Sequence, residues 1–354
     1  MSVVVPVFNR LALLEKTVAS LSAQTLADAE FILIDDRSDE AVQRYLAALS
    51  TTDPRFTVIV KPAGQLRGCQ NSRNLGLDQC SGEAVVFLDS DDLLSPTCLD
   101  RRHAFMSSHP ETDIVVGSQA IFTAQDEKMH LVNVPDERAS NIDRFLALSH
   151  PLDVPWVNGG VAIKISALSG NKIRWRPEFH WDDVAFHFEC VAKGMTVRWL
   201  PEREPDSFYR SHSLDRFGEK LFSPDGLLSS ARMLAWMRDL LETYDELNEP
   251  RRARLVTDFF HACFMRAVDL HLDELAADLV SVALDGKVLT RAESRRMRTY
   301  AAGRLSFRSL PRVTYYWNRF SEATILSGYT GQNGGTFGTI VANTRERSLA
   351  PSIW

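Results

Sequence analysis

Cysteine is scarce in this sequence and shows none of the spacings that are typical of a metal or redox centre. The 354 residues contain five cysteines, at Cys69, Cys80, Cys98, Cys190 and Cys263. No two of them form a C-x-x-C pair, which argues against a zinc ribbon or a thioredoxin-like site, and an odd number cannot pair completely in disulfides. We therefore expect a reducing, cytoplasmic setting.

Long hydrophobic runs are also missing. No apolar stretch approaches the roughly 20 residues that a helix needs to cross a bilayer. The opening residues, Ser2 to Phe8, are too few and too β-branched for a signal peptide. Any membrane contact is therefore expected from the surface, which leaves peripheral attachment at the inner face of the membrane open.

Positive charge is not in excess. The chain has 40 Lys and Arg against 46 Asp and Glu, and its formal net charge is −6. Because proteins that bind nucleic acids usually carry a basic surface, we expect no nucleic-acid partner.

Short apolar runs alternate with helical spacing through the first half of the chain. Residues 3–8, 31–34, 57–60 and 84–88 are continuously apolar, which is typical of strands that helices cover on both faces. Repeated strand–helix units predict an α/β fold with a Rossmann-like, doubly wound, mostly parallel sheet. Amphipathic helices dominate after about residue 223. We expect an α/β catalytic domain over residues 1–220 and a helical C-terminal extension over residues 221–354. The inner stripes of its first two helices are expected at Leu234, Met237, Leu241 and Tyr244, and at Leu255, Phe259, Cys263 and Val268.

Carboxylates gather at the end of the fourth predicted strand. Asp89, Asp91 and Asp92 follow Leu88 almost directly. Residues two apart in an extended chain point the same way, and open α/β sheets bind ligands beyond the carboxyl ends of their strands. Asp89 and Asp91 can therefore converge on one ligand, and a hard divalent cation would neutralise them. The alternative is an acidic loop that caps the helix expected near Pro96.

Two further polar segments are expected near the same sheet edge. Asp36 ends the second strand and could bind a uracil or a ribose; the alternative is ordinary helix N-capping by Ser38 and Asp39. Arg73, on a polar helix before the acidic strand, can bind a diphosphate with its forked cation. Its alternative is a surface arginine on a solvated helix.

Two later segments carry candidates for acid–base and metal chemistry. Asp182 and Asp183 open a helix, where the helix dipole favours acids in any case. The functional hypothesis is a general base, with Trp181 forming a wall of a sugar pocket. His212 could ligate a metal ion or contact a diphosphate, although a lone histidine in a loop more often does neither.

Taken together, these segments resemble the inverting glycosyltransferase family 2, which has the GT-A fold. The resemblance runs in order through residues 4–9, 34–38 ("DDGS"), 72–76 ("ARNxG"), 88–92 ("LDxDD"), 181–184 and 209–212 ("YRxH"). Several such segments together are specific, whereas any single one is weak. Three positions depart from the pattern: Arg37 stands in place of the usual glycine, Ser72 in place of alanine, and Asp182 where many members carry glutamate or glutamine.

The resemblance implies a role for each matching residue. Contacts with the nucleotide would come from Pro6, Val7, Asp36, Arg73 and Asp89. A metal ion, Mn²⁺ or Mg²⁺, would be bound by Asp91 and His212. Asp183 would be the catalytic base, although the neighbouring acid leaves this choice slightly open, and the donor and acceptor sugars would meet Trp181, Asp182 and Asp92.

The implied activity is transfer of a sugar, with inversion, from a nucleoside diphosphate donor to a hydroxyl group. The donor is expected to be a UDP-sugar and the acceptor a glycan or a lipid-linked glycan, as in polysaccharide or cell-envelope biosynthesis. Two alternatives are a sugar nucleotidyltransferase, which normally needs a glycine-rich loop after its first strand, and a sugar-binding scaffold that has lost catalysis. Intact Asp89, Asp91 and Asp183 argue against the scaffold.

A basic segment follows the helices of the extension. Residues 287–319 contain nine Lys and Arg against one acid, Glu293, with aromatic residues between them. One hypothesis is a membrane-surface segment that brings the enzyme to a lipid-linked acceptor. The alternative is a solvated helix face that pairs with the acidic domain or with an oligomer partner.

Overall fold

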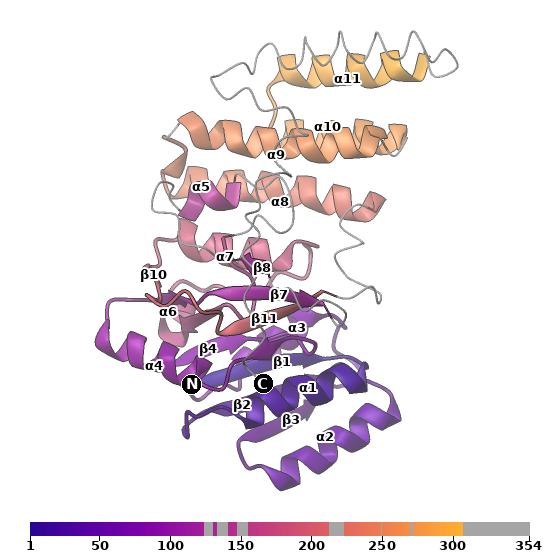
Figure 1. Ribbon diagram of the computed structural model, residues 1–354. Coiled ribbons are helices and arrows are strands. Elements are labelled where there is room, and N and C mark those ends of the chain that lie inside the picture. Colours follow the sequence, from indigo (N-terminus) through magenta and orange to yellow (C-terminus); the bar gives the residue numbers. More distant parts are fainter. Residues whose placement is uncertain are drawn as a thin grey trace. The chain divides into compact units, whose positions relative to one another are not determined.

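The computed structural model describes residues 1–123, 130–132, 141–146, 155–211, 223–248, 250–269 and 272–306 (Figure 1). These residues fall into two compact units, of which the first holds the described residues up to 211 and the second those from 223 onward. The second unit is predicted to contact the acceptor, a membrane surface or an oligomer partner, and these roles stay predictions.

The first unit is built on a seven-stranded, mostly parallel sheet. Its strand order is β10-β6-β9-β4-β1-β2-β3. The bounds are β1 Ser2–Val7, β2 Glu30–Asp35, β3 Phe56–Val60, β4 Ala84–Phe87, β6 Ile114–Val116, β9 Val161–Lys164 and β10 Val197–Trp199. β9 runs antiparallel to both of its neighbours, β4 and β6, while the other described pairs are parallel.

Helices cover both faces of this sheet, as the apolar runs predicted. They are α1 Leu11–Ser22, α2 Glu40–Thr52, α3 Cys69–Leu77, α4 Cys98–Ser108, α5 Asn141–Leu146, α6 Ile165–Gly170 and α7 Asp182–Ala192. Alternate residues of β1 join a core with the buried stripes of α1 and α2, while α3 packs on the opposite face. Of the two expected caps of α2, the structure uses Asp39, which accepts the Val42 N–H at 3.0 Å, and not Ser38, whose hydroxyl instead accepts the N–H of Asn9.

Gly76 allows α3 to approach the sheet closely. A Cβ atom at this position would stand 2.4 Å from Cγ1 of Val4 and 3.3 Å from Cγ1 of Ile34. A side chain there would have to displace two buried strand residues, because interiors are packed too densely to absorb an extra methyl group. This close contact fixes the height of α3, and therefore of Arg73, above the strands.

A second, four-stranded sheet lies next to the acidic loop in the sequence and in the fold. Its order is β5-β11-β7-β8, with bounds β5 Leu93–Leu94, β11 Ser207–Ser211, β7 Gln119–Thr123 and β8 His130–Val132. β7 and β8 pair antiparallel. Because β5 follows directly after Asp92, this sheet anchors the C-terminal end of the acidic loop.

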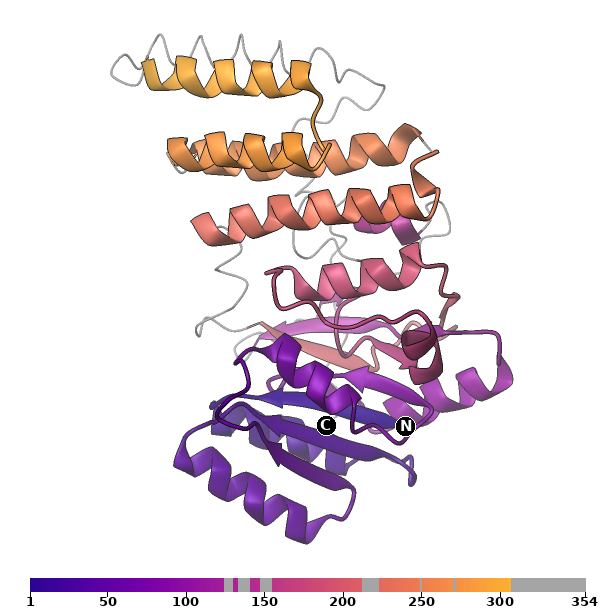
Figure 2. The ribbon, with the colours of Figure 1, turned by 180° about the vertical axis from the view of Figure 1, so that it is seen from behind.

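The second unit is helical, with α8 Pro224–Thr243, α9 Pro250–Asp269, α10 Asp273–Asp285 and α11 Arg291–Ser306 (Figure 2). Leu234, Met237 and Leu241 are buried as predicted, but Tyr244 is exposed because α8 ends before it. On α9, Cys263 is buried as predicted and Leu255 is only partly buried, while Val256 and Phe260 also face the core. Among the residues described, no helix is both long and apolar enough to cross a bilayer.

Candidate active site

The carboxyl ends of β1, β2 and β4 meet at one edge of the main sheet. β1 pairs with β2 on one side and with β4 on the other, so the strand order reverses at this point. Doubly wound sheets bind ligands at such a point, because the loops that leave neighbouring strands diverge there. Residues 8–10, 36–39 and 89–92 directly follow these three strands. The structure therefore brings two of the predicted polar segments, that of Asp36 and the acidic loop, to the same edge as the turn after β1.

Arg73 of α3 joins the acidic loop to helix α7. Its Nη1 donates to Oδ2 of Asp182 at 2.6 Å, and its Nη2 donates to Oδ1 of Asp89 at 2.5 Å. The side chain is only 4% exposed. Burial lowers the pKa of Arg73, but the nearby charges, first that of Asp89, outweigh this effect and raise it, so the cation is permanent. The residue predicted to bind the donor thus also links two elements of the site.

The rest of the α3 motif fixes the platform below Arg73. The Asn74 amide donates from Nδ2 to the carbonyl of Trp175 and accepts the Trp175 N–H at Oδ1, both at 2.9 Å. The indole ring stacks on Phe186 of α7, with centroids 4.1 Å apart, and the guanidinium carbon of Arg73 lies 4.4 Å from its centroid. Because Asn74 and the stacked Phe186 ring hold Trp175 in place, its indole ring supports the Arg73 cation through a cation–π contact.

Asp183 stands in the first turn of α7, beside the acid that Arg73 holds. It is partly exposed, and its Oδ1 accepts the Val184 N–H at 2.8 Å. Burial, followed by the charge of Asp182, raises the pKa of Asp183 from 3.8 to about 7, although the bond from Val184 opposes the rise. A carboxylate that titrates near neutrality is well suited to take a proton. Trp181, which precedes the pair, is buried with 6% of its surface exposed.

Asp91 and Asp92 are each held by an arginine from elsewhere in the chain. Oδ2 of Asp91 accepts from Nη1 of Arg10 at 3.0 Å. Arg210 of β11 donates its backbone N–H to Oδ1 of Asp92 and its Nε to the carbonyl of Asp91, both at 2.8 Å. Burial, followed by the charges of Asp91 and Asp89, raises the pKa of Asp92 well above its ordinary value. Burial is also the main reason that the pKa of Asp89 is raised.

The acidic loop offers a divalent cation a partial set of ligands. Carboxylate oxygens suit Mg²⁺ and Mn²⁺, and the side chain of Asp91 is 17% exposed at the sheet edge. The buried Oδ2 of Asp92 has no hydrogen-bond partner within the described part of the chain. Among those residues, no three or more His, Cys, Asp or Glu are arranged to hold a metal. His212, the second predicted ligand, lies outside the described residues. A cation on Asp91 would therefore complete its coordination with diphosphate oxygens and water, as Mg²⁺ commonly does.

At the β2 end of the edge, Asp36 is held from two sides. Its Oδ1 lies 3.1 Å from Nζ of the buried Lys61, and its Oδ2 accepts the Gly68 N–H at 2.7 Å. The two residues predicted to touch the nucleoside, Pro6 and Val7, are part of β1, and the Val7 carbonyl accepts the Asp36 N–H at 2.8 Å. These three predicted nucleotide contacts therefore lie next to one another.

Sequence reasoning missed three side chains at this edge: Phe8, Arg10 and Arg210. Phe8 is half exposed directly after β1, which is unusual for a phenylalanine. Asn9 and Arg10 both have left-handed backbones, with φ of 56° and 60°. The Asn9 amide oxygen also accepts the Asp39 N–H at 2.9 Å, so this turn is tied to the start of α2. The turn directs Arg10 toward an acid 81 residues away, a partner that no local signal could reveal.

Two buried polar groups near the site are structural. Arg102 makes a bidentate pair with Asp206, at 3.0 and 2.7 Å, and donates to the carbonyl of Gly159 at 2.7 Å. Burial, followed by the charge of Arg73, lowers the pKa of His187 to about 3, so this ring is neutral. Its Nε2 lies 3.3 Å from Oδ1 of Asn158. These contacts hold the segment that leads into β9.

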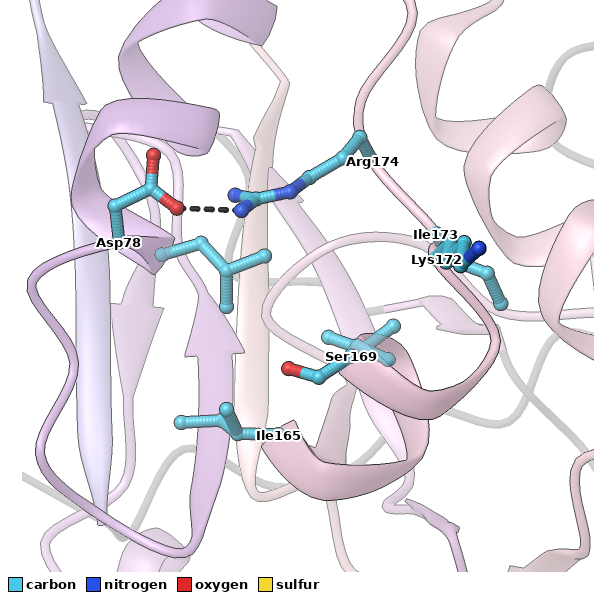
Figure 3. Close-up of a pocket in the computed structure, with 8 residues that line it drawn as sticks. Asp78, Ile165, Ser169, Lys172, Ile173 and Arg174 are labelled. Carbon is cyan, nitrogen blue, oxygen red and sulfur yellow. Dashed lines mark ion pairs between the residues drawn. The ribbon is translucent and has the colours of Figure 1, made fainter.

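A separate pocket lies near the opposite edge of the sheet, between the end of α3 and α6 (Figure 3). Its lining includes the exposed ion pair of Asp78 and Arg174, together with Ile165. Ile165 follows Lys164, the partner of the first residue of β4. None of the predicted site residues contributes to this lining, so it is not part of the candidate active site.

Comparison with known proteins gives concordant results. The family model "Glycosyl transferase family 2" matches residues 2–172. An uncharacterized glycosyltransferase of Haemophilus influenzae is 31% identical over 213 residues, which cover 59% of this chain and 78% of that protein. The GalNAc(5)-diNAcBac-PP-undecaprenol beta-1,3-glucosyltransferase of Campylobacter jejuni is 40% identical over 94 residues, which cover 27% of this chain and 30% of that enzyme. This second match thus spans less than a third of the enzyme's length.

The fold has solved counterparts. The crystal structure of S. aureus TarS 1-349 in complex with UDP-GlcNAc has a TM-score of 0.64 and 17% sequence identity, and the match covers 92% of this chain and 91% of that one. At this identity the likeness shows the fold alone, and it confirms the expected GT-A type with a helical C-terminal region. From the family model and its Haemophilus influenzae relative, this chain belongs to glycosyltransferase family 2.

Proposed function

We propose that this protein transfers a sugar, with inversion, from a nucleoside diphosphate donor to a hydroxyl of a glycan or lipid-linked acceptor. A UDP-sugar is the proposed donor, since TarS of the same fold was crystallised with UDP-GlcNAc. The name of the Campylobacter jejuni relative states an undecaprenol-linked acceptor, which supports a lipid-linked acceptor here. Cytoplasmic location, with contact at the inner face of the membrane, is part of the same proposal.

The observation that carries the proposal is the pair of adjacent acids at the start of α7. Asp182 is bonded to Arg73, which also holds Asp89 of the acidic loop. Asp183 has a pKa raised to about 7, mainly by burial. The same arginine therefore ties the proposed donor-binding loop to the helix that carries the proposed base. A base and a donor site must be held together if an acceptor hydroxyl is to attack the donor carbon.

In the proposed reaction, Asp183 removes the proton of the acceptor hydroxyl as its oxygen attacks the anomeric carbon. The new carbon–oxygen bond forms on the face opposite the diphosphate, and the bond between that carbon and the diphosphate oxygen breaks. The electron pair leaves with the nucleoside diphosphate, and the proton stays on Asp183 until solvent removes it. Attack from the opposite face inverts the anomeric carbon, by the same geometric logic as in inverting glycosidases.

The remaining site residues would bind and orient the donor. Asp36, Pro6 and Val7 are the proposed nucleoside contacts, and Asp89 the proposed contact to the ribose or the diphosphate. When bound to Asp91, Mn²⁺ or Mg²⁺ would stabilise the charge that builds on the departing diphosphate. Asp92 has a supporting role, since it is bonded to the backbone of Arg210.

The experiment that tests this function is a panel of nucleotide sugars incubated with the protein and Mn²⁺, followed by product analysis. Transfer or slow hydrolysis of one donor, together with loss of turnover in Asp183→Asn, is the expected result. No turnover of any donor by the wild-type protein would instead favour a sugar-binding scaffold. Release of pyrophosphate from a nucleoside triphosphate would favour a nucleotidyltransferase.

The helix α11 is the proposed contact with an anionic membrane surface. Its exposed cationic side chains are those of Arg291, Arg295, Arg296 and Arg298. Its one acid, Glu293, is engaged at the start of the helix, where its carboxylate accepts the N–H of Thr290 at 2.8 Å. The exposed face is therefore strongly basic, and basic helices associate with anionic lipids. The alternative is that this face pairs with an oligomer partner, and co-sedimentation with anionic liposomes distinguishes the two.

A further inference from the structure

Arg37 adopts a backbone conformation that glycine would adopt more easily. It follows Asp36 directly, and its φ is 61°. In this left-handed region the Cβ of an L-residue is crowded by the backbone, so the conformation costs free energy that glycine does not lose. The family resemblance expects glycine at this position. A strained residue next to a proposed ligand contact needs a compensating interaction.

The side chain of Arg37 supplies such an interaction. Its Nη1 donates to the carbonyl of Ala63 at 2.9 Å, and its Nη2 to the carbonyl of Gln65 at 3.3 Å. Both carbonyls belong to the loop of residues 61–68, which connects β3 to α3. Two hydrogen bonds from one planar cation to carbonyls two residues apart fix the loop in position as well as in orientation. A glycine at position 37 could make neither bond.

The loop of residues 61–68 also supplies two of the groups that hold Asp36, beside the Arg37 guanidinium, whose Nη2 lies 3.8 Å from Oδ1 of Asp36. Lys61 is its first residue, and its Nζ lies 3.1 Å from Oδ1 of Asp36. Gly68 is its last, and its N–H donates to Oδ2 of Asp36 at 2.7 Å. Any movement of the loop would therefore change the position of the carboxylate that we propose binds the nucleoside.

The same loop reaches the exposed aromatic ring at the end of β1. The guanidinium of Arg67 lies 5.3 Å from the centroid of the Phe8 ring. Arg67 also donates to the backbone carbonyl of Arg37 at 3.5 Å. Arg37 thus donates hydrogen bonds to the loop and accepts one from it, and the loop contacts both Asp36 and Phe8.

We propose that Arg37 is a positioning residue for the nucleoside end of the donor site. Its side chain holds the loop of residues 61–68 as a preformed wall beside Asp36 and Phe8, and the strained backbone is retained for this contact. The inference rests on the proposed function, because it assumes that this edge binds the nucleoside of the donor. A preformed wall improves binding by removing the ordering cost that a mobile loop would impose.

The test is the substitution Arg37→Gly, with Lys172→Gly as the matched control. Lys172 also has a left-handed backbone, with φ of 53°, and lies in the pocket at the opposite edge of the sheet (Figure 3). Both substitutions relieve the same kind of strain, but only the first removes a loop contact. UDP affinity is measured by calorimetry, the thermal midpoint by scanning calorimetry, and kcat and KM with the donor found active in the panel.

We expect Arg37→Gly to weaken UDP binding about three- to tenfold, which is the cost of immobilising about one loop side chain on binding. Its thermal midpoint should equal or exceed that of the wild type, and kcat at saturating donor should change less than about twofold. Lys172→Gly should bind UDP as the wild type does. Arg37→Lys, which can reach one carbonyl, should recover part of the affinity.

Wild-type UDP affinity in Arg37→Gly would overturn the inference and leave the proposed function standing. A parallel fall in thermal midpoint, kcat and affinity would also overturn it, because that result indicates a general structural role. Failure of the wild-type protein itself to bind UDP, with or without Mn²⁺, would overturn the proposed UDP site and the inference with it.

Discussion

Replacing Asp183 with asparagine should remove activity and yet stabilise the protein at alkaline pH. The folded protein raises the pKa of this carboxyl from 3.8 to about 7, mainly through burial and then through the charge of Asp182. A group whose pKa is raised on folding binds its proton more tightly in the folded state. Its contribution is therefore fully present below about pH 4 and is lost as the pH rises through about 7. Asparagine is similar in shape but carries no charge, so the variant escapes this loss.

The size of the effect follows from the rise in pKa. At about 1.4 kcal/mol for each pH unit, a rise from 3.8 to about 7 sets a ceiling of about 4 kcal/mol. Because Asp183 is partly exposed, solvent screening reduces this figure, and about 2 kcal/mol is a realistic expectation. The free energy of unfolding of Asp183→Asn should therefore exceed that of the wild type by about 2 kcal/mol at pH 8, and by almost nothing at pH 4.

The assay is urea denaturation of both proteins at pH 4, 6 and 8, together with the pH dependence of transfer. Wild-type kcat/KM should rise with pH and level off above about 7, since the base must be deprotonated. The variant should lose at least 10²-fold in rate, which is the lower range for general-base assistance.

The neighbouring Asp182 provides the control. Asp182→Asn removes one carboxylate from the buried Arg73, so it should destabilise the protein at every pH, by up to about 3 kcal/mol. If Asp183→Asn gains no stability at pH 8, or gains the same amount at all three pH values, the argument for an elevated pKa fails.

Three further predictions concern the scaffold, the metal and the extension. Gly76→Ala should lower the free energy of unfolding by about 1–3 kcal/mol in urea, because its Cβ would overlap a β1 side chain. EDTA should abolish transfer, and Mn²⁺ should restore it. Arg10→Gln should tighten Mn²⁺ binding about two- to fivefold, since it removes a cation from Asp91. The affinity is measured by electron paramagnetic resonance with UDP present, and an unchanged affinity would refute competition between Arg10 and the metal. Arg295→Glu with Arg298→Glu should reduce co-sedimentation with anionic liposomes severalfold while activity on a soluble acceptor persists; equal sedimentation, or a changed oligomeric state, would favour the partner-contact alternative.

The strands and the edge that they form were predictable from local pattern. Continuous apolar runs identified β1 to β4, and in β1, β2 and β4 the reason is that strands buried on both faces leave no room for polar residues. The parallel order then placed the acids after β4 and Asp36 after β2 at the same edge. These steps need only neighbouring residues and the general rules of sheet topology.

The partners of the site residues were not predictable, because they depend on contacts distant in sequence. Arg73 pairs with carboxylates 16 and 109 residues away, and Asp91 with an arginine 81 residues before it. The choice between Ser38 and Asp39 as the cap of α2 was equally undetermined, since both are good caps; Asp39 takes this role, and the Ser38 hydroxyl contacts the distant Asn9.

The position of β9 has a consequence for the order in which the molecule folds. This strand, residues 161–164, lies between β4 and β6, both of which come earlier in the chain. Until β9 inserts, the sheet consists of two parts, each with an unpaired edge, and closing such long-range pairings is slow. A nascent chain or a fragment that ends before β9 would expose those edges to other chains. Truncations made to isolate the nucleotide-binding half should therefore retain at least residues 1–164, or aggregation will replace folding.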